Sequence, residues 1–246
     1  MSRGESEAQP RQAASGMRGW ISFWNRENSI YVSARHRDVH FRTIAADLRA
    51  YVPGPNAVVL DYGCGEALHA DSVADATGLL ILSDAAPAVR ERLRQRFAHH
   101  AKIEVRAPEQ VEALEDGGLD LVILNSVAQY LTTEELDRLL ALFRRLLKSG
   151  GLLVLGDVVP PAHSTLAAIA ALIRFAARNG FLLAALTGLV RTAFSDYRKL
   201  RTKVGLTVYE EAAMAEKLNA AGFTARRART NIGHNPARMT FIAERR

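Results

Sequence analysis

The stretch Val58-Val-Leu-Asp-Tyr-Gly-Cys-Gly65 decides the fold, because it joins an apolar strand pattern to a glycine-rich turn. The apolar residues before Asp61 are typical of a strand buried on both faces of a parallel sheet. Gly63 and Gly65 let the backbone turn sharply and approach a ligand closely. Open α/β sheets bind nucleotides where such a turn leaves the carboxyl end of a strand. The stretch therefore predicts a nucleotide-type site after the first strand.

Two common phosphate-binding loops do not fit this turn. A dinucleotide fingerprint needs a small residue three positions after Gly65, where Leu68 stands, and a Walker loop needs a Gly-Lys-Ser/Thr that does not follow. Asp61 instead places a carboxylate beside a ligand that carries an amino group. Asp84, at the end of the next apolar run, stands where such folds hold an acid for the ribose hydroxyls. A nucleoside with a cationic amino acid fits both acids. The alternative function of Asp84 is to cap the helix that begins near Ala86 or Pro87.

After the glycine turn, short apolar runs alternate with segments of helical periodicity. This alternation predicts parallel strands joined by crossover helices on both faces of the sheet. Thr132-Thr-Glu-Glu135 predicts a capping box at the start of the clearest helix, which Lys148-Ser-Gly-Gly151 ends, and Thr207-Val-Tyr-Glu210 predicts a second box. The apolar runs lie at 57–61, 79–82, 103–105, 119–124 and 152–155, and two further strands are expected near 223–230 and 238–244.

Length and composition fit one large folded domain. The 246 residues are 48% hydrophobic and 24% charged, enough to bury a sizeable core. Residues 1–16 are small and polar and predict a disordered start, so the domain is expected over 17–246, with helices between Trp20 and Tyr51. One cysteine and no apolar signal segment favour a cytoplasmic protein.

These features together resemble the class I S-adenosylmethionine-dependent methyltransferases. The resemblance spans residues 58–158 and rests on the glycine stretch, Leu82-Ser-Asp84, Leu119-Asp-Leu-Val-Ile-Leu-Asn125 and Leu146-Leu-Lys-Ser-Gly-Gly-Leu152, in that order. It implies an α/β fold with a Rossmann-like, seven-stranded, mostly parallel sheet, helices on both faces and an antiparallel last strand. It also implies S-adenosylmethionine as cofactor, S-adenosylhomocysteine as product and no metal. The cofactor-binding residues that it implies are Asp61, Gly63, Cys64, Gly65, Asp84 and Asn125.

One position departs from the family pattern. Many members end the third strand with an acid that holds the adenine amino group, whereas Arg106-Ala-Pro-Glu109 stands here. Pro108 has no backbone N–H to offer. We expect Glu109, or alternatively Gln110, to take over this function.

The candidates for catalysis are His36, Tyr130 and His163. In this resemblance His36 lies on a helix that folds over the cofactor, Tyr130 follows the strand that faces the transferred methyl group, and His163 lies just beyond the fifth strand. Each also has a purely structural interpretation, since a lone histidine or a tyrosine before a capped helix is commonly a core residue. Cys64 is interpreted as packing in the cofactor loop rather than as a nucleophile.

An inserted segment at about 160–206 interrupts the alternation with two apolar runs of near ten residues each, too short to span a membrane. It carries seven cations against one anion, so it holds the whole formal net charge of +6. We expect a helical hairpin that caps the carboxyl ends of the strands. It is interpreted as a packed cap, as a lid over an apolar acceptor, or as a surface at 165–203 for anionic lipid.

The sequence thus predicts methyl transfer to an apolar small-molecule or lipid-like acceptor. The alternatives are a cofactor-binding scaffold without turnover, a membrane-peripheral module and an RNA methyltransferase. Nucleic acid is disfavoured because few aromatic residues interleave the basic ones and the segment is strongly apolar. The identity of the acceptor, the atom that is methylated and the oligomeric state stay open.

Overall fold

The computed structural model describes residues 20–22, 24–25, 31–162, 164–192 and 206–246. Seven strands form one twisted sheet in the order β3-β2-β1-β4-β5-β7-β6. The first five strands are parallel, and β7 pairs antiparallel with both β5 and β6. The strands are β1 Val58–Tyr62, β2 Leu79–Ser83, β3 Ile103–Arg106, β4 Leu119–Asn125, β5 Leu147–Val158, β6 Phe223–Arg227 and β7 Met239–Arg245.

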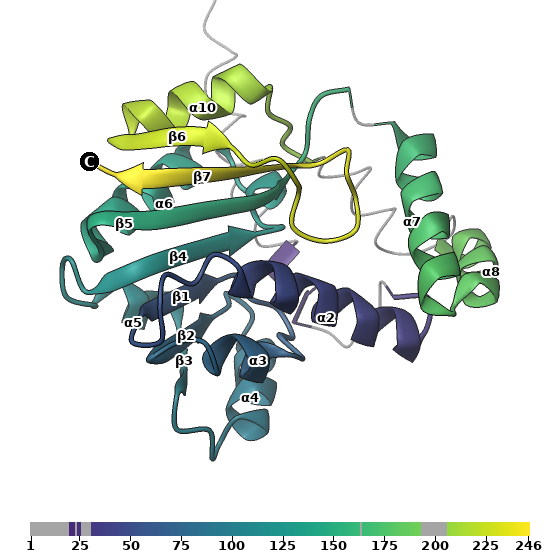
Figure 1. Cartoon of the computed structure of the whole chain (residues 1–246), viewed down its shortest axis with the longest axis horizontal. Helices are drawn as coiled ribbons and strands as arrows, with labels where there is room; N and C mark the ends of the chain where they lie inside the picture. Colours follow the sequence, from purple (N-terminus) through teal and green to yellow (C-terminus); the bar gives the residue numbers. More distant parts are fainter. Residues whose placement is uncertain (1–19, 23, 26–30, 163, 193–205) are drawn as a thin grey trace, which may run out of the picture.

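Helices cover both faces of this sheet, as predicted (Figure 1). The helices are α2 Ala34–Arg49, α3 Ala70–Ala74, α4 Pro87–Arg96, α5 Pro108–Glu112, α6 Thr133–Leu146, α7 Thr165–Asn179, α8 Leu182–Thr192 and α10 Glu211–Ala220, with the short 3-10 helix η1 at Ala128–Tyr130.

Alternation along the strands builds two separate cores. Leu60 and Leu153 pack with α5, α6 and α10 on one face, whereas their neighbours Val59 and Val154 pack with α2, α3 and α4 on the other. Successive side chains of a strand point to opposite faces, so a central strand must be apolar at every position. This explains why the strand stretches read as unbroken apolar runs.

The capping box that opens α6 is confirmed. The Thr132 hydroxyl accepts from the backbone N–H of Glu135 at 3.2 Å, and the Glu135 carboxylate accepts from the backbone N–H of Thr132 at 2.8 Å. The predicted stop at 148–151 belongs instead to β5, which starts at Leu147 directly after α6. A register shift between β4 and β5, with Gly150 at φ +75°, accommodates the extra residues.

The second predicted capping box is wrong. The helix α10 starts at Glu211, after the N-cap Glu210, which forms no side-chain cap. Thr207 binds the loop after η1 instead, because its hydroxyl donates to the carbonyl of Leu131 at 2.7 Å and its N–H donates to the carbonyl of Gln129 at 2.9 Å. A partner distant in the sequence therefore replaced the local cap that the motif suggested.

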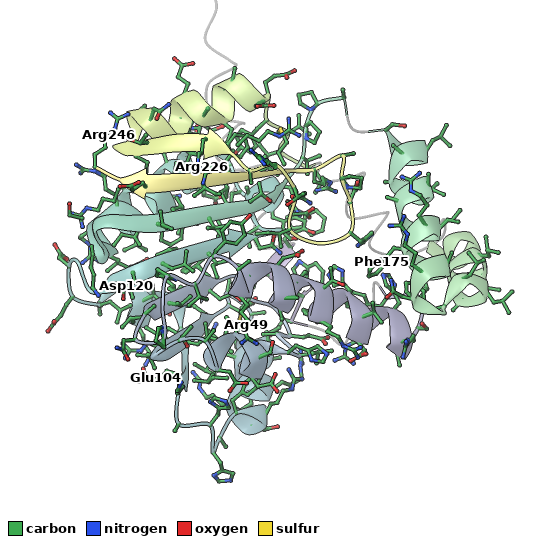
Figure 2. The ribbon with its side chains drawn as sticks, viewed as in Figure 1. Arg49, Glu104, Asp120, Phe175, Arg226 and Arg246 are labelled. Carbon is green, nitrogen blue, oxygen red and sulfur yellow. The ribbon has the colours of Figure 1, made fainter. Side chains whose placement is uncertain are left out.

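The inserted segment forms the expected helical hairpin of α7 and α8, beyond the carboxyl ends of the central strands (Figure 1). The hairpin has a small core of its own around Ala176, Phe181 and Ala185. Phe175 points from α7 toward the loop before β7, where its ring stacks on His234 at 4.6 Å between centroids (Figure 2). The predicted disordered residues 1–16 lie outside the described part of the chain.

Candidate active site

The glycine loop after β1 has the backbone geometry that its sequence predicts. Gly63 and Gly65 adopt positive φ angles of +77° and +57°, which side chains disfavour. The N–H groups of Gly63 and Cys64 donate to the carbonyl of Ser83 at 2.7 and 3.0 Å, so the loop is tied to the end of β2. A Cβ atom on Gly63 would lie 2.4 Å from the Val127 side chain, whereas one on Gly65 would meet open space.

Asp84 ties the loop to the start of α4. One carboxylate oxygen accepts from the N–H of Gly65 at 3.0 Å, and the other accepts from the N–H of Ala86 at 2.8 Å. Burial raises the pKa of Asp84, and these two hydrogen bonds oppose the increase. The carboxylate thus serves the loop and the helix start together. Each oxygen keeps a further acceptor position, enough for two ribose hydroxyls.

Asp61 is a buried carboxyl group that lines a cavity beside the glycine loop. Burial, followed by the negative charge of Asp84, raises the pKa of Asp61 to about 7. Within the described residues its side chain forms no hydrogen bond or ion pair. A cationic group bound beside Asp61 would stabilise the ionised form, so the position favours a positively charged ligand.

Cys64 is not suited to nucleophilic attack. Burial raises the pKa of its thiol well above the ordinary value, and the negative charges of Asp61 and Asp84 add to the increase. The thiol therefore stays protonated at neutral pH, whereas a nucleophile must be a thiolate. This supports the interpretation of Cys64 as a packing residue of the loop.

The structure distinguishes the two candidates for the adenine end. The side-chain oxygen of Gln110 accepts from the N–H of Ala107 at 2.8 Å and caps α5. Glu109 lines the cavity together with Pro108 and Glu112. Of the two, Glu109 is thus the one placed to meet a ligand.

The glycine loop, Asp61, Asp84 and Glu109 line one cavity of about 1390 Å³ at the carboxyl edge of the sheet. Six aromatic side chains contribute to its wall. The ring of Tyr130 lies 4.4 Å from that of Trp20 and 6.3 Å from that of Trp24, between centroids, and packs the first described helical segment against η1. The aromatic lining consists of Trp20, Trp24, Tyr31, Phe41, Tyr62 and Tyr130.

Of the two predicted catalytic residues that the structure describes, Tyr130 lies in the lining and His36 does not. His36 is buried outside it, where its Nδ1 accepts from the N–H of Val32 at 3.3 Å and its ring stacks on Phe181 at 4.9 Å. Burial, followed by the charge of His234, lowers the pKa of His36 to about 4. These contacts join α2 to the hairpin. His163 lies outside the described residues.

His40, one turn after His36, is a lining residue that the sequence reasoning missed. Burial, followed by the charges of His234 and His36, lowers its pKa to about 3, so its imidazole is neutral at physiological pH. The i, i+4 spacing on α2 was the available signal, but only the packing shows which of the two faces the cavity.

Polar residues at the ends of β4 and β5 also line the cavity. Ser126 and Asp157 both have φ +59°, and the Ser126 hydroxyl donates to the Asp157 carboxylate at 2.9 Å. The side-chain oxygens of Asn125 and Gln129 are buried without a hydrogen-bond partner among the described residues. Such atoms are costly to leave unpaired, so they favour a ligand that carries N–H or O–H donors.

A model of the methyltransferase domain family matches residues 59–151, which include the glycine loop, Asp84 and β4. Residues 59–151 are thus similar to the methyltransferase domain family, and the chain has the fold of the class I methyltransferases. S-adenosylmethionine is the methyl donor of this class. A comparison with curated proteins finds no match.

Solved methyltransferase structures share the fold. The Burkholderia thailandensis 1,6-didemethyltoxoflavin-N1-methyltransferase is 17% identical with a TM-score of 0.58, and the alignment covers 99% of this chain and 93% of that one. The Synechocystis magnesium protoporphyrin IX methyltransferase is 20% identical with a TM-score of 0.56, covering 99% and 100%. The Haemonchus contortus phosphoethanolamine N-methyltransferase 1 is 22% identical with a TM-score of 0.51, covering 62% of this chain. The chain spans only 34% of the length of that nematode enzyme.

The residues of this methyltransferase site fit its donor. Asp84 has free acceptor positions for ribose hydroxyls, and the backbone at Gly65 leaves open space. Asp61 and the unpaired Asn125 oxygen suit a cationic amino acid. Among the described residues, no three His, Cys, Asp or Glu side chains come together as a metal site.

Proposed function

We propose that this protein transfers the methyl group of S-adenosylmethionine to an apolar small-molecule or lipid-like acceptor. The observation that carries the proposal is the single cavity, in which the glycine loop and two buried acids lie at one end and an aromatic wall lies at the other. The acids suit the charged donor. The rings offer a large apolar contact area to an acceptor.

The residues around the cavity would act mainly by orientation. When bound, S-adenosylmethionine supplies a methyl group activated by a sulfonium. Asp84 and Asp61 hold the ribose and the amino acid at the loop, while the aromatic wall positions the acceptor and excludes water. Fixing two reactants in line lowers the barrier without any covalent step on the protein. If the acceptor is a hydroxyl or an acidic carbon, Asp157 is a lining group that would accept its proton.

Calorimetric titration with S-adenosylmethionine and S-adenosylhomocysteine tests the cofactor part of the proposal. We expect saturable binding of one molecule per chain, and no binding at millimolar ligand would contradict the proposal. A scaffold would bind both molecules without turnover on any acceptor of a broad panel. An RNA methyltransferase would bind RNA with a steep dependence on salt concentration.

A second candidate function, contact with an anionic membrane surface, is favoured by the exposed face of the hairpin. Leu166 and Leu183 expose 77% and 81% of their surface, and Leu186 exposes 46%. Arg174 and Arg178 of α7 are exposed on the same hairpin. Apolar side chains beside cations suit the interface of anionic lipid. Among the described residues, no helix has both the length and the apolar character needed to cross a membrane.

Sedimentation with vesicles tests this contact. Vesicles of phosphatidylcholine with about one third phosphatidylglycerol should pull down the wild-type protein, and the double variant L183D/L186D should stay in the supernatant. Val208→Asp is the matched control, because Val208 is 45% exposed outside the hairpin. Equal sedimentation of the double variant and the wild type would exclude the hairpin as the contact.

A further inference from the structure

Arg238 lies at the acceptor end of the cavity because β7 runs antiparallel. Met239, the first residue of β7, pairs with Val158, the last residue of β5. The start of β7 therefore reaches the same edge as the carboxyl ends of the parallel strands. This register brings Arg238 to Asp157, although the two lie 81 positions apart in the sequence, and both side chains line the cavity.

Arg238 is only loosely paired. Its Nη1 lies 3.6 Å from a carboxylate oxygen of Asp157 and donates to the Asp157 carbonyl at 3.3 Å. Its Nε is buried and has no hydrogen-bond partner among the described residues. The hydrogen bond that Arg238 donates among these residues comes from Nη1, not from Nη2. The side chain is 13% exposed. The guanidinium edge formed by Nε and Nη2 thus keeps its donors although the group is largely removed from water.

The Asp157 carboxylate has hydrogen-bond donors other than Arg238. Its carboxylate accepts from the Ser126 hydroxyl at 2.9 Å and from the Asn231 amide at 3.3 Å. Asn231 also accepts from the backbone N–H of Asp157 at 3.2 Å. These bonds hold Asp157 in its left-handed conformation without help from Arg238. The arginine is therefore free to share its charge with a ligand.

We infer that Arg238 binds a carboxylate on the acceptor, with Asp157 holding the guanidinium in place. This inference rests on the proposed function and narrows its acceptor to an apolar molecule that carries one carboxylate. The two donors of a guanidinium edge match the two oxygens of a carboxylate, which is the geometry of bidentate arginine recognition. A dianionic phosphate would be disfavoured, because the nearby charge of Asp157 offsets most of the single positive charge.

The test compares an apolar acid with its neutral amide. Calorimetry in the presence of saturating S-adenosylhomocysteine would measure the binding of 2-naphthoate and 2-naphthamide. We expect the wild-type protein to prefer the acid by about tenfold or more, as for a charge-assisted hydrogen bond. Arg238→Met should abolish the preference. Asp157→Asn, which suits a positive φ, should strengthen the preference because it removes the competing carboxylate.

The controls separate this inference from the fold and from the cofactor site. Affinity for S-adenosylhomocysteine should stay within about twofold in both variants, and Arg226→Met, an exposed arginine of β6, should leave every value unchanged (Figure 2). Equal binding of acid and amide, absence of acid binding, or a preference that persists in Arg238→Met would overturn the inference. Failure of the wild-type protein to bind S-adenosylhomocysteine would overturn the proposed function as well.

Discussion

The two ends of the cavity differ in how the chain builds them. At the cofactor end, the loop and its two acids come from residues 61–86, and the N–H of Gly65 reaches Asp84 only 19 positions away. At the acceptor end, Ser126 follows β4, Asp157 lies at the end of β5 and Arg238 precedes β7, so that 31 and 81 positions separate Asp157 from the other two. Short-range contacts leave a motif in the sequence, whereas long-range contacts depend on strand order and direction.

The largest effect should come from the bridge that defines the cofactor end. Asp84→Ala removes the acceptor for the N–H groups of Gly65 and Ala86, and with it the group that we propose to bind the ribose. Hydrogen bonds to a charged group contribute about 1.5–3 kcal/mol each, so we expect the affinity for S-adenosylmethionine to fall about 100-fold. Calorimetry measures it, with Asp75→Ala, an exposed acid of the same region, as the matched control. A loss below about fivefold would show that Asp84 only caps α4.

The loop itself should be sensitive to one added methyl group. Gly63→Ala introduces a Cβ atom 2.4 Å from Val127 at φ +77°. The left-handed conformation alone costs about 1–2 kcal/mol, and the clash adds to it, so the free energy of unfolding should fall by about 2 kcal/mol. Urea denaturation measures this decrease. Gly54→Ala, where the added atom meets open space, should change stability by far less. Similar losses for both variants would contradict the loop geometry.

Cofactor binding should depend on pH through Asp61. Because its pKa is raised to about 7 in the ligand-free protein, Asp61 is increasingly protonated as the pH falls below 7. A cationic ligand that needs the ionised form should lose affinity by about tenfold per pH unit below 7, which equals about 1.4 kcal/mol per unit. Calorimetric titrations with S-adenosylmethionine from pH 8 to pH 5.5 measure how the affinity depends on pH. Asp61→Asn should bind weakly at every pH and remove this dependence; a wild-type profile that is already flat would argue against contact with the cation.

The smallest effect should come from His36, which joins α2 to the hairpin. Its folded pKa of about 4 lies below the unfolded value of 6.5, so the unfolded state gains a proton first as the pH falls. Stability from neutral His36 is therefore complete above pH 6.5 and is lost as the pH decreases toward 4. The wild-type protein should lose about 1.8 kcal/mol of unfolding free energy between pH 7 and pH 5 through His36, and His36→Phe should remove this loss, measured by urea denaturation. Its affinity for S-adenosylmethionine should stay unchanged, and a large decrease would place His36 at the cofactor end.

Of the two capping boxes that local sequence patterns predicted, the structure contains one and lacks the other. The Thr132 and Glu135 box forms as predicted, because both partners lie within one helical turn. The equivalent pattern at Thr207 fails, because its hydroxyl finds the carbonyl of Leu131 instead, 76 positions away. A capping motif is thus reliable only where no distant group competes for the same hydrogen bond.

The sequence by itself determined the strands, the glycine loop and the acids Asp61 and Asp84. These features depend on apolar runs and on backbone conformations that few residues adopt. Only the tertiary structure decided that His40 rather than His36 lines the cavity, and that Arg238 meets Asp157. The physical reason is that helix packing and the antiparallel register of β7 bring together residues whose separation along the chain carries no local signal.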